Sequence, residues 1–368
     1  MAKHDIGFAA VARLAGVSNA TVSNTLNRPE IVAPATRERV LAAIEELDFV
    51  PNRAAATLRQ GTNRLIGLVI PDIANPFYSA IARGVTEAAA EHGYTVALCV
   101  SHDDPDLELR HFEMLAEHRA AGALVAPLTA DASRLAQLRR VGSRLVLMDR
   151  TAPEGTGCSV AIDDVHGGEL AVAHLLATRR HGGDGTPQPS GHVVHDVPRT
   201  AKRAATPGPG IVLVNGDVAI PQCADRREGA RNAFIAAGLD PDDLREVTVD
   251  EMTVDAGRIA GRRIAARTPR PTGVFCTNDQ LALGVIRGLN DGGLAVPDEV
   301  SVVGYGDLAL AADGRVPLTT VEQPKDELGR VAVEILLAEL GADRAAHEHV
   351  TRTLEPHLVV RESAPLPA

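Results

Sequence analysis

The 368-residue sequence has no apolar run of the ~20 residues that a membrane span needs, and its mean hydropathy is close to zero. Its amino terminus, MAKHDIGFAAVARLAG, has no apolar stretch followed by a cleavage site. The four cysteines, Cys99, Cys158, Cys223 and Cys276, are scattered and have neither metal-ligand spacing nor the density of a disulfide scaffold. These absences exclude a membrane protein, make export unexpected, and predict a cytoplasmic chain.

Motifs for catalysis and for cofactor binding are also missing. The sequence has no nucleophile elbow, no P-loop, and no Gly-x-Gly-x-x-Gly after a strand-like run. Three histidines, His181, His192 and His195, share one segment but lack the supporting cysteine or carboxylate spacing of a metal site. We therefore expect no enzyme, no catalytic residue, no cofactor and no bound metal.

Net charge and length limit how the chain can be divided into domains. A net charge of -11 argues against a protein that coats nucleic acid along its whole length. The first sixty residues differ, with seven basic against six acidic side chains, so a small nucleic-acid-binding module at that end stays open. Because 368 residues exceed what one hydrophobic core usually organises, two or three domains are expected.

From Arg64 onward, apolar runs of strand length alternate with amphipathic stretches of helix length. The predicted strands are Leu65–Ile70, Thr95–Val100, Ala123–Pro127, Leu145–Met148, Ile211–Val214, Val247–Val249, Val274–Cys276 and Val300–Tyr305. The predicted helices are Tyr78–His92, Leu107–His118, Ala132–Arg140, Arg226–Ala237, Asp255–Ala266 and Gln280–Asn290. Apolar strands joined by helices are typical of parallel sheets covered on both faces. So many units predict two doubly wound lobes with a ligand site between them.

Residues 178–210 interrupt this alternation. The segment is rich in glycine and proline and contains no aromatic residue. A structureless loop of this length is uncommon inside a compact domain. We therefore predict a flexible, disordered insertion at this place.

The first fifty residues carry the spacing of three short helices. Phe8, Val11, Ala12 and Ala15 recur at helical spacing, Gly16 suits a left-handed helix exit, and Ser18 suits the N-cap of a helix at Asn19–Asn27. A third helix is expected at Thr36–Leu47, capped by Thr36, with Val40, Leu41, Ile44 and Leu47 turned inward. Two short helices joined by a glycine-containing turn predict a helix-turn-helix, whose second helix enters the DNA major groove. A three-helix bundle used only for packing is the alternative.

Residue identities favour the DNA-binding interpretation. VARLAGVSNATVSNTLNRPEIVAPATRERVLAAIEELDFVPNRAAATLR closely resembles the headpiece and hinge of the LacI/GalR family of bacterial transcriptional repressors. RLIGLVIPDIANPFYSAIARGV, VFCTNDQLALG, VSVVGYGD and LTTVEQPKDELG resemble the effector domain of the same family, which is similar to periplasmic sugar-binding proteins. The resemblance covers nearly the whole chain apart from the insertion.

The resemblance implies an α/β protein with an all-α headpiece and a two-lobed periplasmic-binding-protein-like domain of two doubly wound parallel sheets. The expected parts are a helix-turn-helix headpiece at 1–50, a hinge helix and linker at 51–62, and an effector-binding and dimerisation domain at 63–368. Lobe one would hold about 63–161 and 324–350, and lobe two about 162–323 and 351–363. The family acts as homodimeric repressors on pseudo-palindromic operators in double-stranded DNA, which is the expectation here.

The resemblance also places the DNA contacts at the start of the second helix. The matching positions are Ser18, Asn19, Ala20, Thr21, Ser23 and Asn24. Asparagine can bond adenine through two hydrogen bonds, and an alanine methyl can touch a thymine methyl. The three hydroxyl side chains suit phosphate oxygens. Many family members carry arginine at the position of Asn24, so no operator sequence is carried over.

Asn52–Arg59 resembles the family's hinge helix. At about two turns it is too short to be stable alone. The matching DNA-binding positions are Asn52, Arg53, Ala55 and Leu58, with Arg53 and Arg59 expected near phosphates. Leu58 matches an apolar wedge that opens a minor-groove base step and kinks the duplex. An ordinary linker leucine packed on the core is the alternative for that residue.

Nine positions match ligand contacts in the sugar-binding relatives: Asn75, Phe77, Tyr78, Asp149, Arg150, Arg226, Asn278, Tyr305 and Gln323. An aromatic face can stack on a sugar ring while amides and charged groups bond its hydroxyls. Taken singly, each residue is more often a cap, a turn or a solvated side chain. Together they predict a small polar effector, a carbohydrate in the first instance.

One position departs from the family. Gly306 stands where family members usually carry an aspartate that bonds sugar hydroxyls, and Asp307 follows it. Either Asp307 takes over or the site accepts a larger or less hydroxylated compound. The competing hypothesis for the whole chain is a solute-binding protein for carbohydrate uptake, which would need export and leaves the headpiece without a role.

Overall fold

The computed structural model describes residues 7–49, 63–127, 132–140, 144–179, 210–342 and 347–366. The chain divides into two compact units, Met1–Asn63 and Arg64–Ala368. The predicted hinge, with Asn52, Arg53, Ala55 and Leu58, lies outside the described residues, as does the predicted insertion between 180 and 209. Across the described parts, no helix combines the length and apolar character that a bilayer span requires.

The described part of the first unit is helical. It holds α1 (Phe8–Ala15), α2 (Asn19–Asn27), the 3-10 turn η1 (Pro29–Ile31) and α3 (Pro34–Glu46). Val11, Ala12 and Ala15 pack with Val22, Val40, Ala43 and Phe49 in one small core. Gly16 has φ 64° and ψ 42°, which confirms the left-handed helix exit.

Two details of the third helix were predicted wrongly. It begins at Pro34 and not at Thr36, and Thr36 does not cap it. Proline suits the first helical turn because a backbone N–H there has no hydrogen-bond partner within the helix, so its absence in proline costs no bond. Leu41 was expected to point inward, but it is 48% exposed, since Val40 and Ala43 already fill the contact with α1.

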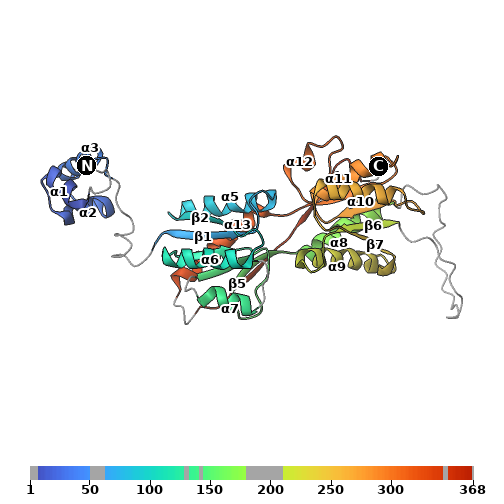
Figure 1. The fold of residues 1–368 in the computed structure, drawn as a ribbon, viewed down its shortest axis with the longest axis horizontal. Helices are drawn as coiled ribbons and strands as arrows, with labels where there is room; N and C mark the ends of the chain where they lie inside the picture. The colour runs from blue at the N-terminus through green and yellow to red at the C-terminus, as the bar shows by residue number, and fades with distance from the viewer. Residues whose placement is uncertain are drawn as a thin grey trace, which may run out of the picture. The chain divides into compact units, whose positions relative to one another are not determined.

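A six-stranded sheet forms the first lobe of the second unit (Figure 1). Its strands are β1 (Leu65–Ile70), β2 (Thr95–Val100), β3 (Gly122–Val125), β4 (Arg144–Met148), β5 (Cys158–Ile162) and β11 (Thr351–Leu354). They lie in the order β11-β5-β4-β3-β1-β2, and every pairing is parallel.

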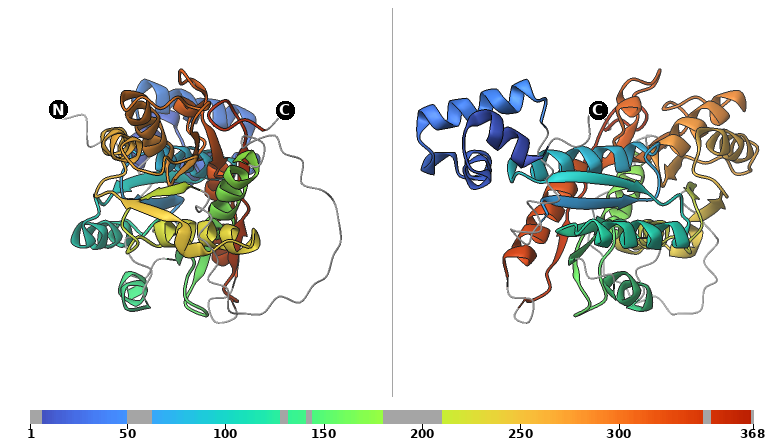
Figure 2. Two further views of the ribbon diagram at one scale, coloured as in Figure 1. Left: turned by 90° about the vertical axis from the view of Figure 1, so that its right-hand side faces the viewer. Right: turned by 60° about the vertical axis from the view of Figure 1, so that its left-hand side comes forward.

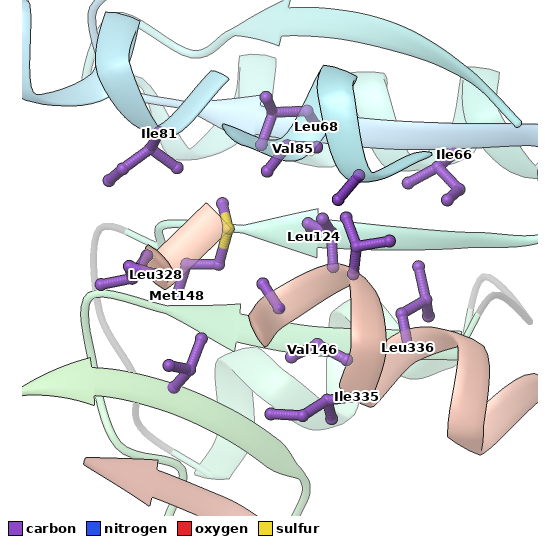
Figure 3. Packing of buried hydrophobic residues seen from close by; sticks show 14 of the residues in the cluster. Ile66, Leu68, Ile81, Val85, Leu124, Val146, Met148, Leu328, Ile335 and Leu336 are labelled. Carbon is purple, nitrogen blue, oxygen red and sulfur yellow. The ribbon is translucent and has the colours of Figure 1, made fainter. Parts of the chain in front are cut away.

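Helices cover both faces of this sheet (Figure 2). Helices α5 (Pro76–Glu91) and α13 (Lys325–Gly341) cover one face, and α6 (Pro105–Glu117) and α7 (Ala132–Arg140) cover the other. Ile66 and Leu68 face α5 and α13, as Figure 3 shows, while Val69 faces the α6 side. This burial on both faces explains why β1 is apolar along its length.

The second lobe repeats the plan. Its strands are β6 (Ile211–Asn215), β7 (Arg245–Thr248), β8 (Gly273–Cys276), β9 (Ser301–Gly306), β10 (Thr319–Glu322) and β12 (His357–Val359), in the order β12-β10-β9-β8-β6-β7. Only β12 is antiparallel among these pairings. Helices α8 (Asp164–Arg179) and α9 (Pro221–Ala236) cover one face, and α10 (Val254–Ala265) and α11 (Asp279–Asp291) cover the other. The turn η2 (Pro241–Asp243) and the short helix α12 (Ala309–Ala312) complete the described elements.

Both sheets place their first strand between the second and the third, which is the doubly wound order that binds ligands beyond the carboxyl ends of the strands. This confirms the predicted α/β fold class.

The chain passes between the two sheets three times. The crossings fall between β5 and α8, between β10 and α13, and between β11 and β12. The expected return to lobe two at about residue 351 is wrong, because Thr351–Leu354 pairs with β5 in the first sheet. The predicted insertion also begins too early, since α8 continues through Arg179.

Candidate DNA-contacting helix and effector site

Helix α2 begins with a side-chain cap. The Ser18 Oγ accepts a hydrogen bond from the Thr21 backbone N–H at 3.1 Å and lies 2.9 Å from the Thr21 Oγ1. This confirms Ser18 as the N-cap. Such a cap satisfies one of the free N–H groups of the first turn and is worth about 1 kcal/mol.

One face of α2 is fixed to the headpiece core and the other is not. Val22 is fully buried, and buried Thr25 donates its hydroxyl to the Thr21 carbonyl at 2.9 Å. Asn19 and Ala20 are exposed at the start of the helix. The predicted contact residues Thr21, Ser23 and Asn24 are half-buried. The start of α2 therefore offers polar side chains on a helix that its neighbours hold in place, as groove reading requires.

A buried charged cluster lies in the second lobe. The Arg226 Nε of α9 donates to the Asp164 Oδ1 at 2.9 Å, and its Nη1 donates to the Thr277 carbonyl at 2.7 Å. The guanidinium carbon stands 3.9 Å from the centre of the Tyr305 ring. Tyr305 donates its hydroxyl to the same Asp164 oxygen at 2.7 Å. All three side chains are buried, so the ion pair is largely shielded from solvent.

The Tyr305 hydroxyl remains a donor within this cluster. Burial raises the pKa of Tyr305 well above its usual range, and the negative charge of Asp164 raises it further. Arg226 acts in the opposite direction but does not outweigh these two effects. Tyr305 therefore keeps its proton at neutral pH and donates it to Asp164.

A hydrogen bond between the lobes adjoins this cluster. Asp149 follows β4 in the first lobe, with a φ of 62° and a buried side chain. Gln222, in the first turn of α9, donates from Nε2 to the Asp149 Oδ2 at 2.7 Å and to its backbone carbonyl at 2.9 Å. Burial, together with the charge of Asp164, raises the pKa of Asp149 to about 7 although Arg226 and Arg150 lower it.

The remaining predicted residues of the first lobe lie nearby. Tyr78 is half-buried, and burial together with the charge of Asp149 raises its pKa. The Phe77 ring meets it edge to face at 5.1 Å between centroids. Arg150 donates from Nε to the Pro127 carbonyl at 2.9 Å. Asn75 caps α5 by accepting the Phe77 N–H at 3.0 Å.

Two predicted residues of the second lobe lie near the ends of its strands. Both polar atoms of the Asn278 side-chain amide form hydrogen bonds within the protein. Its oxygen accepts the Leu281 N–H at 2.7 Å, and its nitrogen donates to the Met252 carbonyl at 2.9 Å. It is the N-cap of α11. Gln323 is buried, and its Nε2 has no hydrogen-bond partner among the described residues. Gln323 is therefore better placed than Asn278 to bond a ligand.

Gly306 suits its own backbone. Its φ of 130° is a conformation that favours glycine, which fits the lack of an aspartate there. The neighbouring carboxylate of Asp307 pairs with Arg361 at 2.7 Å. Asp307 is thus engaged with the carboxyl-terminal segment and does not stand free to replace the missing aspartate.

Sequence reasoning missed Asp164 and Gln222. Asp164 comes just after the strand Cys158–Ile162, as Asp149 comes just after Arg144–Met148, so the two carboxylates hold similar places at strand ends. Gln222 lies four residues before Arg226 on α9, a spacing that puts both side chains on one helix face. Both signals were present in the sequence.

A helix-turn-helix unit joined to a two-lobed fold, with charged and polar groups from both lobes meeting at the strand ends, defines a DNA-binding regulator controlled by a ligand. Comparison with known families agrees. Residues 9–52 match "Bacterial regulatory proteins, lacI family". Residues 63–183 match "Periplasmic binding proteins and sugar binding domain of LacI family", and residues 210–364 match "Periplasmic binding protein-like domain".

Similar proteins extend over almost the whole chain. The chain is 33% identical over 355 residues to the ribose operon repressor of Escherichia coli K12, covering 96% of this chain and 98% of that one. It is 33% identical over 356 residues to the transcriptional repressor PurR of Vibrio parahaemolyticus, covering 96% and 97%. The chain belongs to the LacI family of bacterial transcriptional regulators.

Solved structures show the same fold. The Lac repressor dimer bound to operator and the anti-inducer ONPF aligns with a TM-score of 0.80 at 24% identity, covering 98% of this chain and 99% of that one. The complex of the transcriptional regulator CelR with cellobiose aligns with a TM-score of 0.66 at 30% identity, covering 97% and 99%.

Proposed function

We propose that this regulator is a homodimeric repressor that binds a pseudo-palindromic operator through α2 and the hinge. Its affinity for the operator falls or rises when a small polar effector, in the first instance a sugar, binds between the lobes. The relatives named for the ribose operon and the cellobiose-bound regulator support a sugar. A repressor of this kind works on DNA in the cytoplasm and returns its effector unchanged, without catalysis.

The bond between Asp149 and Gln222 carries this proposal. It joins the end of a first-lobe strand to the first turn of a second-lobe helix, one turn from the Arg226 cluster. A hydroxylated ligand can donate to the Asp149 carboxylate and accept from the Gln222 amide, and so exchange this direct contact between lobes for two contacts with itself. The ligand changes DNA affinity only to the extent that it binds one arrangement of the lobes better than the other.

The test separates the two binding activities. Operator sequences are selected from random duplexes with the purified protein, and sugars are screened by the shift in melting temperature. Asn19→Ala should weaken operator binding by about tenfold, because one two-bond contact to a base is worth 1–3 kcal/mol. Its melting shift with the sugar should be unchanged.

Asp149→Asn should show the reverse. At pH 8, above the pKa of about 7 of Asp149, it should weaken sugar binding by about tenfold, because a hydrogen bond to a carboxylate becomes one to a neutral amide, while operator binding without sugar is retained. If no duplex is preferred over random competitor, or if both variants lose both activities together, the proposal fails.

A further inference from the structure

Cys158, His347 and His349 come together at one end of the first sheet, away from the effector site. The Cys158 Sγ lies 3.1 Å from the His347 Nε2 and 3.8 Å from the His349 Nδ1, and the three ligand atoms lie within 4.8 Å of one another. The two histidine rings meet edge to face at 5.5 Å between centroids. We propose that these three side chains form a Zn²⁺ site.

The fold places the three residues at the same point. Cys158 is the first residue of β5, and its neighbour Ser159 is in register with Thr351 of β11. One residue back, Cys158 is in line with Val350, and His349 directly precedes Val350, with its Nδ1 3.8 Å from the Cys158 Sγ. His347 and His349 are two residues apart in the segment that leads into β11, and their rings are in contact. The pairing of β5 with β11 therefore brings one thiol and two imidazoles together.

The distances suit tetrahedral zinc. Bond lengths of about 2.3 Å to sulfur and about 2.0–2.1 Å to nitrogen put the sulfur and nitrogen atoms of such a site about 3.5 Å apart. The two observed sulfur-to-nitrogen distances lie on either side of that value. A site of one thiolate and two imidazoles also favours zinc over Mg²⁺ and Ca²⁺, which prefer oxygen ligands.

Groups around the three ligands support the assignment. The Val350 N–H donates to the Cys158 Sγ at 3.5 Å, a contact that orients the sulfur. The Glu339 carboxylate interacts electrostatically with both Cys158 and His349, and its Oε2 is buried without a hydrogen-bond partner in the described part of the chain. Glu339 therefore adds a negative charge near the site, which Arg139 and its own partner Arg144, at 3.7 Å, partly offset.

Three protein ligands leave a fourth position for water or an added anion. The ion would join the start of β5 to the segment that leads into β11, and so tie the carboxyl-terminal segment to the first sheet. Zinc binding should therefore raise the melting temperature of the effector unit. Sequence spacing gave no sign of the site, because Cys158 and His347 are 189 residues apart.

The experiment uses the full chain without a histidine tag, freed of metal by chelation. Titration with Co²⁺, a spectroscopic substitute for Zn²⁺, should produce a thiolate-to-cobalt charge-transfer band at one ion per chain, and Zn²⁺ should remove it. Cys158→Ser should abolish the band. His349→Ala, at an exposed position that folding tolerates, should weaken binding by at least about tenfold.

Two variants serve as controls. Cys99→Ser changes another buried cysteine, on β2, and His357→Ala changes an exposed histidine on β12; both should leave the band intact. The thiolate band also separates this site from binding by His181, His192 or His195 alone. The proposal is overturned if the wild type gives no band, if the band survives Cys158→Ser, or if His349→Ala binds cobalt as tightly as the wild type.

Discussion

Arg226 illustrates how one residue can serve both structure and ligand binding. The resemblance to sugar-binding relatives points to it as an effector contact, but all the contacts observed for its side chain lie inside the second lobe, to Asp164, the Thr277 carbonyl and the Tyr305 ring. Removing it leaves the buried carboxylate of Asp164 without its partner. A change made to test the effector response would therefore also test the stability of the lobe.

Arg226→Ala should lower the free energy of unfolding by about 3–5 kcal/mol, because it leaves an unpaired buried charge. The neighbouring residue offers a matched control. Arg227 pairs with Glu246 at 2.7 Å, but its side chain is 41% exposed, so Arg227→Ala should cost no more than about 1 kcal/mol. Urea unfolding followed by circular dichroism measures both changes. Equal losses in the two variants would contradict the structural role given to Arg226.

Single-residue features with a local cause were the most predictable. The Ser18 cap and the left-handed Gly16 were predicted correctly, because each depends only on the few residues around it. The roles of Asn75 and Asn278 as caps follow from similarly local patterns, whereas the pairing of Asp164 with Arg226 joins positions 62 residues apart. No periodicity in a single sequence reports such a contact.

At the scale of elements, glycines set how closely the helices pack. Helices α8 and α9 touch at Gly229, where an added Cβ would stand 1.8 Å from the Val165 carbonyl oxygen. Helices α10 and α11 approach in the same way, and a Cβ on Gly284 would stand 2.0 Å from the Val254 carbonyl oxygen. Each face of the second lobe is thus covered by a helix pair whose backbones nearly meet.

Gly229→Ala should therefore destabilise the second lobe by several kcal/mol, since backbone cannot yield as a flexible side chain does. Gly341→Ala, at the end of α13, is the matched control, because nothing lies within 4 Å of the added carbon. It should be neutral or slightly stabilising. Thermal unfolding of the two variants compares them. A melting temperature for Gly229→Ala within a degree or so of the control would show that the helices move apart at little cost.

Strands with apolar sequences were predictable and more polar strands were not. β1 and the edge strand β2 have their predicted bounds, because a run of apolar residues marks each of them. β11 reads Thr-Arg-Thr-Leu and is mostly exposed at a sheet edge, so it lacks that pattern. β5 escaped prediction because its buried Ser159 breaks the apolar run, and the Ser159 hydroxyl pairs with that of Thr351 on β11 at 3.2 Å. This pairing also explains the error in the lobe boundary.

At the scale of the whole molecule, the two-lobed plan follows from the count of strand and helix units, and its function from the headpiece together with the strand-end residues. The contact between the two lobes does not follow from those sequence patterns. The contact between Asp149 and Gln222 depends on where three crossings bring β4 and α9, and crossings are not encoded in local periodicity. Because Asp149 lies at this contact, its titration should contribute to a property of the entire effector unit, the dependence of its stability on pH.

Asp149 titrates near pH 7 when folded and near 3.8 otherwise, because burial disfavours its charge. Between these pH values the folded protein holds the proton and the unfolded chain does not, so stability falls as pH rises toward 7. Between pH 5 and pH 8 this group should account for a loss on the order of 2 kcal/mol. Asp149→Asn keeps an acceptor for Gln222 but does not titrate, so it should lose that much less stability over the same interval.

Tyrosine fluorescence measures this change in the effector unit alone. All three tyrosines, Tyr78, Tyr94 and Tyr305, lie after Arg64, and the chain has no tryptophan. Other groups that titrate in this interval contribute equally to both proteins, so only the difference between wild type and variant is interpreted. Parallel curves of stability against pH would mean that Asp149 is ionised in the folded protein. Its contact with Gln222 would then join the lobes through a charge at neutral pH, and a sugar hydroxyl would have to displace that charged hydrogen bond to enter.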